Sequence, residues 1–204
     1  MPNFAANLTL MFNEVPFLDR FEVAKDCGFN AVEFLFPYDF SAAEVAEKLH
    51  KTGQTLALFN LPPGDWDAGD KGMAAIPGRE QEFQDTVGLA LEYARAFKCK
   101  TVHMMAGIIP GVVGVEAAFE TYVTNYQYCA DAFVGDGIDV IIEPLNTRDV
   151  PGYMISKNSS AHSVIAAAGR PNVGLQFDFY HVQIMGGDLA TQFETYLDIT
   201  KHVQ

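Results

Sequence analysis

The stretch Asp139–Leu145, with the sequence DVIIEPL, contains a run of contiguous β-branched residues that ends on an acid. Contiguous apolar residues, as opposed to alternating ones, are typical of a strand that is buried on both faces. The stretch Gly174–Tyr180, GLQFDFY, has the same form. One acid interrupts each run, Glu143 in the first and Asp178 in the second. The two stretches therefore predict strands of a covered sheet, each with a carboxylate near its end.

Short strand-like runs alternate with longer segments of helical period along the whole chain. Large apolar residues recur at three- and four-residue steps in residues 83–97 and 119–133, which predicts two amphipathic helices. Ser41 is predicted as the N-cap of a helix that begins at Ala42, and Gly53 is predicted to follow that helix. The predicted strands are Phe4–Met11, Ala31–Phe36, Thr55–Asn60, Thr101–Ala106, Asp139–Leu145, Gly174–Tyr180 and His202–Gln204.

Strand–helix alternation predicts parallel strands joined by right-handed crossovers, which leaves a closed barrel or a doubly wound open sheet. Six βα units in roughly 200 residues, followed by the start of a seventh strand, project to eight units in about 250 residues. No GxGxxG or GxxxxGK[ST] turn follows a strand, so a nucleotide-binding open sheet is disfavoured. We therefore predict an α/β fold, a (β/α)8 TIM barrel. Residues 1–204 are expected to be one barrel domain that is incomplete as given, with six βα units and the start of strand 7.

The composition is that of a globular protein, with 49% hydrophobic and 19% charged residues among 204. Three widely spaced cysteines, Cys27, Cys99 and Cys129, suit reduced thiols in a cytosol better than a disulfide framework. No apolar run approaches the length that spans a bilayer, and the start Met1–Asn3 lacks the basic region of a signal peptide. We therefore expect a cytoplasmic protein with no membrane contact.

The net charge of −13 limits the choice of partners. A negative field repels phosphate backbones, so nucleic acid is not expected as a partner. The same field would disfavour an anionic substrate unless the site supplies a local cation, and a bound metal could be that cation.

Three polar side chains stand near predicted strand ends, where a barrel carries its chemistry: Glu143, Asp178 and Gln204. Counted from the predicted strand starts, Glu143 and Asp178 each occupy about the fifth position, which would put them in one layer. Two adjacent carboxylates repel one another unless a cation lies between them. Carboxylate and amide oxygens favour a hard ion such as Mg²⁺ or Mn²⁺. The alternative is that each acid caps a loop.

Two histidines and one further acid are also candidates. His181 follows Asp178 by three residues, and it is either a loop histidine bonded to a backbone carbonyl or a donor to a substrate oxygen. His103 is favoured as a core histidine over a side chain that faces the barrel interior. Glu33 is interpreted as structural, because it stands too early in the predicted strand Ala31–Phe36 to reach the barrel mouth.

Three cations could bind a substrate carboxylate, although pairing with nearby acids is the commoner role for such side chains: Arg79, Lys71 and Arg148. Aromatic residues near the second and third loops could enclose a small pocket, although core packing is the commoner reason for such density. These are Phe34, Phe36, Tyr38 and Trp66.

The chain resembles the hydroxypyruvate isomerase family and its relatives the 2-oxo-tetronate isomerases, which belong to the xylose isomerase-like TIM barrels. The stretches that carry this resemblance extend along the whole chain. They are FAANL (residues 4–8), VEFLFPY (32–38), PGDW (63–66), IPGRE (76–80), IEPLN (142–146) and DFYH (178–181).

The resemblance implies that Glu143, Asp178 and Gln204 bind one divalent metal, Mg²⁺ or Mn²⁺, and that Glu143 is also an acid/base catalyst. It implies substrate contacts for His181 and Asp149, although the epimerase relatives carry a glutamate at the position of Asp149. The family continues past Gln204 with a fourth ligand, which is its second catalytic glutamate, and with an arginine for the substrate carboxylate. The chain is therefore expected to be truncated or incompletely given, and the 204 residues alone could be inactive.

The reaction that the resemblance implies is isomerisation of hydroxypyruvate to 2-hydroxy-3-oxopropanoate (tartronate semialdehyde) through an enediolate. The substrate would be a small 2-oxo acid, and the protein could be a homo-oligomer. 2-Oxo-tetronate is the closest alternative substrate. A ketose 3-epimerase, an abasic-site endonuclease and a non-catalytic barrel are more distant alternatives, and the net charge of −13 disfavours the endonuclease.

Overall fold

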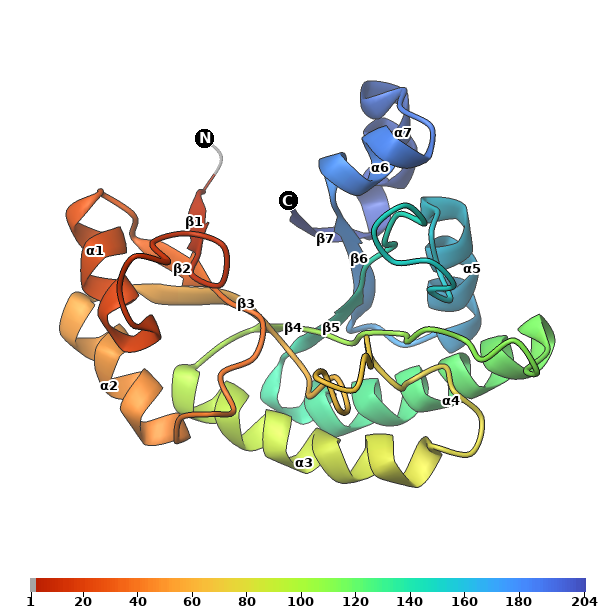
Figure 1. Ribbon diagram of the computed structural model, residues 1–204, viewed down its shortest axis with the longest axis horizontal. Coiled ribbons are helices and arrows are strands. Elements are labelled where there is room, and N and C mark those ends of the chain that lie inside the picture. The colour runs from red at the N-terminus through yellow and green to blue at the C-terminus, as the bar shows by residue number, and fades with distance from the viewer. Residues whose placement is uncertain (1–2) are drawn as a thin grey trace.

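The computed structural model describes residues 3–204, so Met1 and Pro2 lie outside the described residues. It contains one seven-stranded sheet in which every neighbouring pair is parallel and the order follows the sequence (Figure 1). The strands are β1 (Ala5–Asn7), β2 (Ala31–Glu33), β3 (Thr55–Asn60), β4 (Thr101–His103), β5 (Asp139–Ile142), β6 (Val173–Phe177) and β7 (Thr200–Val203).

Helices connect consecutive strands and cover the outer face of the sheet (Figure 1). They are α1 (Arg20–Asp26), α2 (Ala42–Thr52), α3 (Glu80–Phe97), α4 (Val115–Phe133), α5 (Asn158–Ala168), α6 (Phe179–Met185) and α7 (Leu189–Tyr196), with 3-10 turns η1 (Phe17–Asp19), η2 (Val134–Asp136) and η3 (Leu197–Ile199). None of the helices between residues 3 and 204 is both long and apolar enough to cross a bilayer.

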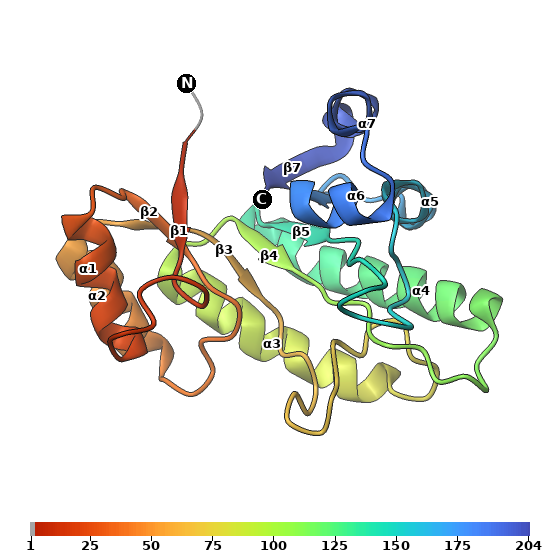
Figure 2. The ribbon, with the colours of Figure 1, turned by 45° about the horizontal axis from the view of Figure 1, so that its top comes forward.

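The sheet is strongly curved, so that β1 and β7 flank the same concave side (Figures 1 and 2). The side chain of His202 on β7 lies 2.8 Å from the carboxylate of Glu33 on β2. A flat sheet of this strand order would hold these two strands far apart, because neighbouring strands are about 4.8 Å apart. Consecutive order, parallel pairing and curvature are those of a (β/α)8 barrel wall, as the sequence predicts.

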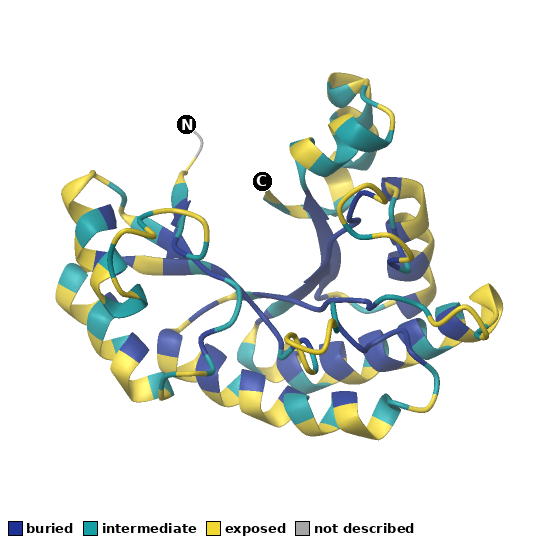
Figure 3. Ribbon diagram, viewed as in Figure 1, coloured by how far each residue is buried: buried dark blue, intermediate teal, exposed yellow. Residues whose placement is uncertain are grey.

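The core lies between the strands and the inner faces of the helices, and the outer helix faces are exposed (Figure 3). Ser41 caps α2 as predicted, because its hydroxyl accepts from the Glu44 N–H while the Glu44 carboxylate accepts from the Ser41 N–H. Gly53 ends α2 with a φ of +64°, a left-handed conformation that suits glycine.

Several predicted strands are too long at their carboxyl ends. β2 ends at Glu33 instead of Phe36, and β1 ends at Asn7, whose carbonyl accepts from the N–H groups of Leu10 and Met11 in a tight turn. The apolar runs continue because the loops that follow the strands also pack into the core: Phe34 is buried outside β2. Hydrophobicity therefore marks the buried segments but not the residue at which pairing stops.

Tyr126 of α4 connects the helix layer to two strands. Its hydroxyl lies 2.8 Å from the carbonyl oxygen of Val140 on β5 and accepts from the N–H of Gly174 on β6 at 3.0 Å. Tyr126→Phe would leave these buried backbone groups without that partner, so we expect a loss of about 1–3 kcal/mol in the free energy of unfolding. Urea denaturation measures it. Tyr128→Phe is the control, because Tyr128 on the same helix is 45% exposed. Equal midpoints for both variants would contradict this reading.

Candidate functional site

A cavity of about 310 Å³ opens at the carboxyl ends of the strands. The three predicted metal ligands, Glu143, Asp178 and Gln204, all line it, and so does His181. Glu143 directly follows β5 and Asp178 directly follows β6. The structure therefore brings together residues that are up to 61 positions apart in the sequence (204 − 143), as expected for the loop end of a barrel.

Glu143, Asp178 and His181 form the centre of this cluster. Each offers one atom that lies within 4.8 Å of the atoms of the other two. His181 Nε2 is 3.7 Å from Asp178 Oδ2 and 3.9 Å from Glu143 Oε1. Such spacing leaves room for an ion or a substrate oxygen between the groups.

Asp178 is oriented by the helix that follows it. As the N-cap of α6, its Oδ1 accepts from the N–H groups of Tyr180, at 2.6 Å, and His181, at 3.2 Å. Its other oxygen, Oδ2, is the atom nearest His181 Nε2. One carboxylate oxygen therefore fixes the side chain, and the other faces the cluster.

The two acids do not share a layer, contrary to the count from the predicted strand starts. The register pairs Ile142 of β5 with Leu175 of β6, so Glu143 lies beside Gln176 and Asp178 is two residues further along. Strands of a barrel are tilted and staggered, and sequence counting does not contain that stagger. The two carboxylates still approach each other because Asp178 lies past the end of its strand, where the chain turns into α6.

The buried position of Glu143 disfavours its ionised form. Burial, and then the nearby carboxylate of Asp178, raise the pKa of Glu143 well above its ordinary value. Burial likewise lowers the pKa of His103 to about 3, so this histidine is neutral. The ionised form of Glu143 is therefore disfavoured unless a cation lies beside it.

The donor set fits a hard divalent cation. Two carboxylates meet in a buried cavity, and the Gln176 side-chain oxygen, also buried, has no hydrogen-bond partner among residues 3–204. Oxygen donors of this kind suit Mg²⁺ or Mn²⁺. Gln204 lies at the same cavity, where its side-chain oxygen accepts from Gln176 Nε2 at 2.9 Å and its Nε2 donates to Glu33.

The prediction that Glu33 lies too early in its strand to reach the cavity was wrong. β2 is only three residues long and ends at Glu33, whose side chain lines the cavity. Its carboxylate accepts from Asn7 Nδ2 at 3.1 Å and lies 2.8 Å from His202 Nε2. Glu33 thus connects β1, β2 and β7 across the concave side of the sheet. Its contacts are structural, as predicted, but its position at the cavity was not predicted.

His103 lies at the cavity and is not a core histidine whose two ring nitrogens are both hydrogen-bonded. It ends β4, lines the cavity and lies with Nδ1 3.9 Å from Glu143 Oε2. Its Nε2 is buried and has no hydrogen-bond partner within the described chain. His103 is buried, as predicted, but the prediction that its ring nitrogens are hydrogen-bonded in the core was wrong.

The cations named from the sequence lie outside the cavity lining. Arg79 makes two 2.8 Å hydrogen bonds to the Asp70 carboxylate and also pairs with Glu82, which confirms the pairing with acids. Lys71 lies 3.2 Å above the ring centroid of Trp66, and Trp66 does line the cavity. Of the four aromatic residues named from the sequence, Phe34 and Trp66 line the cavity, whereas Phe36 and Tyr38 do not.

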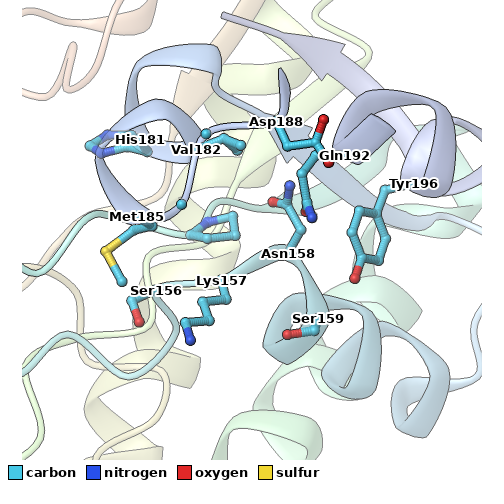
Figure 4. A pocket seen from close by; sticks show the side chains of 13 residues that line it. Ser156, Lys157, Asn158, Ser159, His181, Val182, Met185, Asp188, Gln192 and Tyr196 are labelled. Carbon is cyan, nitrogen blue, oxygen red and sulfur yellow. The ribbon is translucent and has the colours of Figure 1, made fainter. Parts of the chain in front are cut away.

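A second pocket of about 360 Å³ lies between the start of α5 and the helices α6 and α7 (Figure 4). Its lining includes Asn158, Asp188 and Gln192, with His181 at one edge. Neither Glu143 nor Asp178 lines it. The pocket therefore borders the carboxylate cluster only through His181.

Several polar residues at the site were not predicted from the sequence as functional: Asn7, Asn60, Gln176 and Tyr180 line the cavity, and Asn146 contacts His181. Gln176 is a polar residue inside the apolar strand β6, just as Asp178 is a polar residue inside the apolar stretch Gly174–Tyr180. The rule that selected Asp178 could therefore have selected Gln176. Asn146 and Tyr180 lie in loop and helix residues where polar side chains are ordinary. Asp149, a predicted substrate contact, is bonded to both, with its Oδ2 2.8 Å from Asn146 Nδ2 and 2.6 Å from Tyr180 Oη.

Comparison with known families and proteins agrees with this geometry. The family described as "Xylose isomerase-like TIM barrel" matches residues 21–204. The chain is 46% identical over 204 residues to the 2-oxo-tetronate isomerase of Cupriavidus necator, covering 100% of the chain and 78% of that protein. It is 40% identical to the hydroxypyruvate isomerase of Escherichia coli, with 100% and 79% covered.

Solved structures give the same fold. A crystal structure titled as an AP endonuclease, family 2, from Brucella melitensis has a TM-score of 0.98 and 52% identity, covering 100% of this chain and 79% of that one. A D-psicose 3-epimerase from Clostridium cellulolyticum H10 has a TM-score of 0.75 at 16% identity, covering 93% of this chain and 67% of that one, which supports the fold alone.

Proposed function

The chain belongs to the xylose isomerase-like TIM barrel family, and on that premise we propose that it is a metal-dependent isomerase of a short 2-oxo sugar acid. That it is an isomerase follows from relatives that share 40–46% identity over the full chain and carry that name. The observation that carries the rest of the proposal is the buried carboxylate of Glu143 next to the half-buried carboxylate of Asp178, with His181 beside them.

In this proposal Glu143, Asp178 and Gln204 hold one ion, Mg²⁺ or Mn²⁺. When bound, such an ion supplies Lewis-acid polarisation of a substrate carbonyl and stabilises negative charge that develops on its oxygen. It would also favour the ionised form of Glu143, which burial and the nearby carboxylate of Asp178 disfavour. The cavity lining contains no lysine or arginine among the described residues, so a cation at the carboxylates would be the main attraction for an anionic substrate.

Glu143 is the proposed acid/base catalyst. Its carboxylate is buried, which strengthens the basicity of the ionised form. We propose that it takes part in moving a proton between carbon three and carbon two of the substrate through an enediolate. His181 would donate a hydrogen bond to a substrate oxygen. Asp149 is kept as a second proposed contact, although it is exposed and lies outside the lining of both pockets.

Two buried cysteines without disulfides, Cys99 and Cys129, are compatible with a reducing compartment, so we propose a cytoplasmic location. Burial raises the pKa of the Cys99 thiol to about 12 and that of Cys129 above its ordinary range. Both thiols are therefore unreactive, and neither is assigned a catalytic role.

Two substrates compete within this class. The sequence resemblance implies hydroxypyruvate with 2-oxo-tetronate as its closest alternative, and the higher identity of the 2-oxo-tetronate isomerases, 46% against 40%, favours the alternative. They differ by one carbon, and a group of that size changes kcat/KM by only about 10–200-fold. We therefore expect turnover of both compounds, with kcat/KM values within about two orders of magnitude. Assays of both with Mg²⁺ or Mn²⁺ measure it, and turnover of neither would contradict the proposal.

The endonuclease named in one structural relative is a second candidate. DNA binding depends on cations that contact phosphates, whereas this chain has a net charge of −13 and 13 lysines and arginines against 26 acids. We expect no binding of a duplex with an abasic site at low salt. Binding that weakens as salt rises would favour the endonuclease instead.

A further inference from the structure

His181 lies between the carboxylate pair and the loop that follows β5. Its Nε2 faces Asp178 and Glu143 at 3.7 and 3.9 Å. Its other ring nitrogen, Nδ1, faces Asn146, whose backbone N–H donates to it at 3.0 Å. A backbone N–H can only donate, so Nδ1 must be the unprotonated acceptor of the neutral ring.

The side chain of Asn146 presents a second donor to the same atom. Asn146 Nδ2 is 2.8 Å from His181 Nδ1. The orientation of this amide is fixed independently, because its Oδ1 accepts from the backbone N–H groups of Arg148, at 3.1 Å, and Asp149, at 2.9 Å. A flipped amide would turn a donor toward those two N–H groups and an acceptor toward Nδ1. The amide nitrogen therefore belongs beside His181.

Two further residues hold Asn146 in place. Asn146 Nδ2 donates its second hydrogen to Asp149 Oδ2 at 2.8 Å, and the hydroxyl of Tyr180 donates to the same oxygen at 2.6 Å. The backbone N–H of Tyr180 is in turn capped by Asp178. The chain of contacts thus begins at Nδ1 of His181 and returns through Asn146 and Asp149 to Tyr180, its neighbour in α6.

We propose that Asn146, supported by Asp149 and Tyr180, locks His181 in the tautomer that carries its proton on Nε2. His181 then donates a hydrogen bond into the cavity and cannot act as a metal ligand through Nε2. Asn146 is a positioning residue, because it contacts His181 from outside the cavity lining, whereas Tyr180 lines the cavity and also supports Asn146 through Asp149. The effect on catalysis rests on the proposed function, whereas the tautomer itself does not.

Nitrogen-15 NMR of the histidine-labelled protein tests the tautomer without any assay of activity. At about pH 8, above the usual imidazole pKa of about 6.5, we expect His181 Nδ1 to resonate as an unprotonated nitrogen and Nε2 as a protonated one. The Nε2 signal should stay protonated when Mg²⁺ is added. A protonated Nδ1, or loss of the Nε2 proton on addition of Mg²⁺, would overturn the proposal.

Asn146→Asp provides the matched change. It keeps the shape of the side chain and replaces one of the two donors to Nδ1 by a carboxylate oxygen, while the backbone N–H of residue 146 remains. We therefore expect the Nδ1 signal to shift from its unprotonated position toward the protonated one. Asn30→Asp is the control, because Asn30 is exposed and its side chain contacts Lys25, not the site, so the His181 signals should not change. An unchanged His181 spectrum in a folded Asn146→Asp variant would show that Asn146 does not set the tautomer.

Tyr180→Phe is a second variant that tests the same contacts if Asn146→Asp does not fold. It removes only the hydroxyl that supports Asp149, so we expect kcat to fall by about 10-fold or more while KM changes little. The Nδ1 and Nε2 signals of His181 should broaden as its orientation loosens. Unchanged kcat and unchanged signals would overturn the role of Tyr180. If both substrates fail in the unmodified enzyme, the NMR result still decides the tautomer.

Discussion

Glu143→Gln is expected to lower kcat by about 10²–10⁴-fold, the range that a positioned acid/base group contributes. Glutamine has nearly the same shape but cannot take or give the proton. The cavity would keep its form, because Glu143 lies past the last paired residue of β5 and no backbone pairing of the strand depends on its carboxylate. Steady-state kinetics on both 2-oxo acids measure the effect. Near-normal kcat would remove Glu143 from the chemistry.

Glu116→Gln is the control for charge, since Glu116 is exposed on α4. We expect its kcat to match that of the unmodified enzyme. A similar fall in kcat for both variants would mean that net charge, not the site, explains the result.

The stability of Glu143→Gln provides a second readout. The raised pKa of Glu143 means that the folded protein binds a proton that the unfolded chain has released. The stabilisation from that proton is complete below the unfolded pKa of about 4.3 and is lost as pH rises through the raised folded pKa. In metal-free buffer near pH 7, Glu143→Gln should therefore be at least as stable as the unmodified protein.

Removing divalent ions is expected to abolish turnover, and Mg²⁺ or Mn²⁺ should restore it. The physical reason is that Glu143 is buried beside the half-buried carboxylate of Asp178, so that its ionised form is disfavoured unless a cation lies next to it. A ligand that binds only the folded state stabilises it, by about 2.7 kcal/mol at 100 times its Kd. Mn²⁺ should therefore also raise Tm of the chelated protein.

Asp178→Asn and Asp188→Asn separate a specific site from a general effect of charge. Asp178 lines the carboxylate cavity, whereas Asp188 lines only the second pocket. We expect the rise in Tm with Mn²⁺ to be lost in Asp178→Asn and kept in Asp188→Asn. Full activity after exhaustive chelation would contradict the need for a metal.

Most of the fold was predictable because its signals are local. Contiguous apolar runs such as Asp139–Ile142 marked the strands, and the period of residues 83–97 marked α3. The ends of the strands were not predictable, since Phe34 is as buried as the strand that precedes it. Because the predicted strand Ala31–Phe36 was too long, Glu33 was predicted to lie away from the cavity, whereas its side chain lines the cavity.

The site was predictable where one polar residue interrupts an apolar strand, as at Glu143 and Asp178. Both line the cavity with Gln204 and His181. The contacts around them were not predictable. Which residue lies beside Glu143 depends on the stagger between β5 and β6, and the bond from Asn146 to His181 joins residues 35 positions apart. Such relations arise only when the barrel forms.

Isomerisation of hydroxypyruvate in D₂O, followed by NMR, tests the central claim most directly. A carboxylate that transfers a proton exchanges it with solvent, whereas a hydride shift between the two carbons does not. With Mg²⁺ present we expect conversion to 2-hydroxy-3-oxopropanoate with deuterium at carbon two, and no conversion by Glu143→Gln. Conversion without deuterium at carbon two, or equal conversion by that variant, would contradict proton transfer at the Glu143 and Asp178 site.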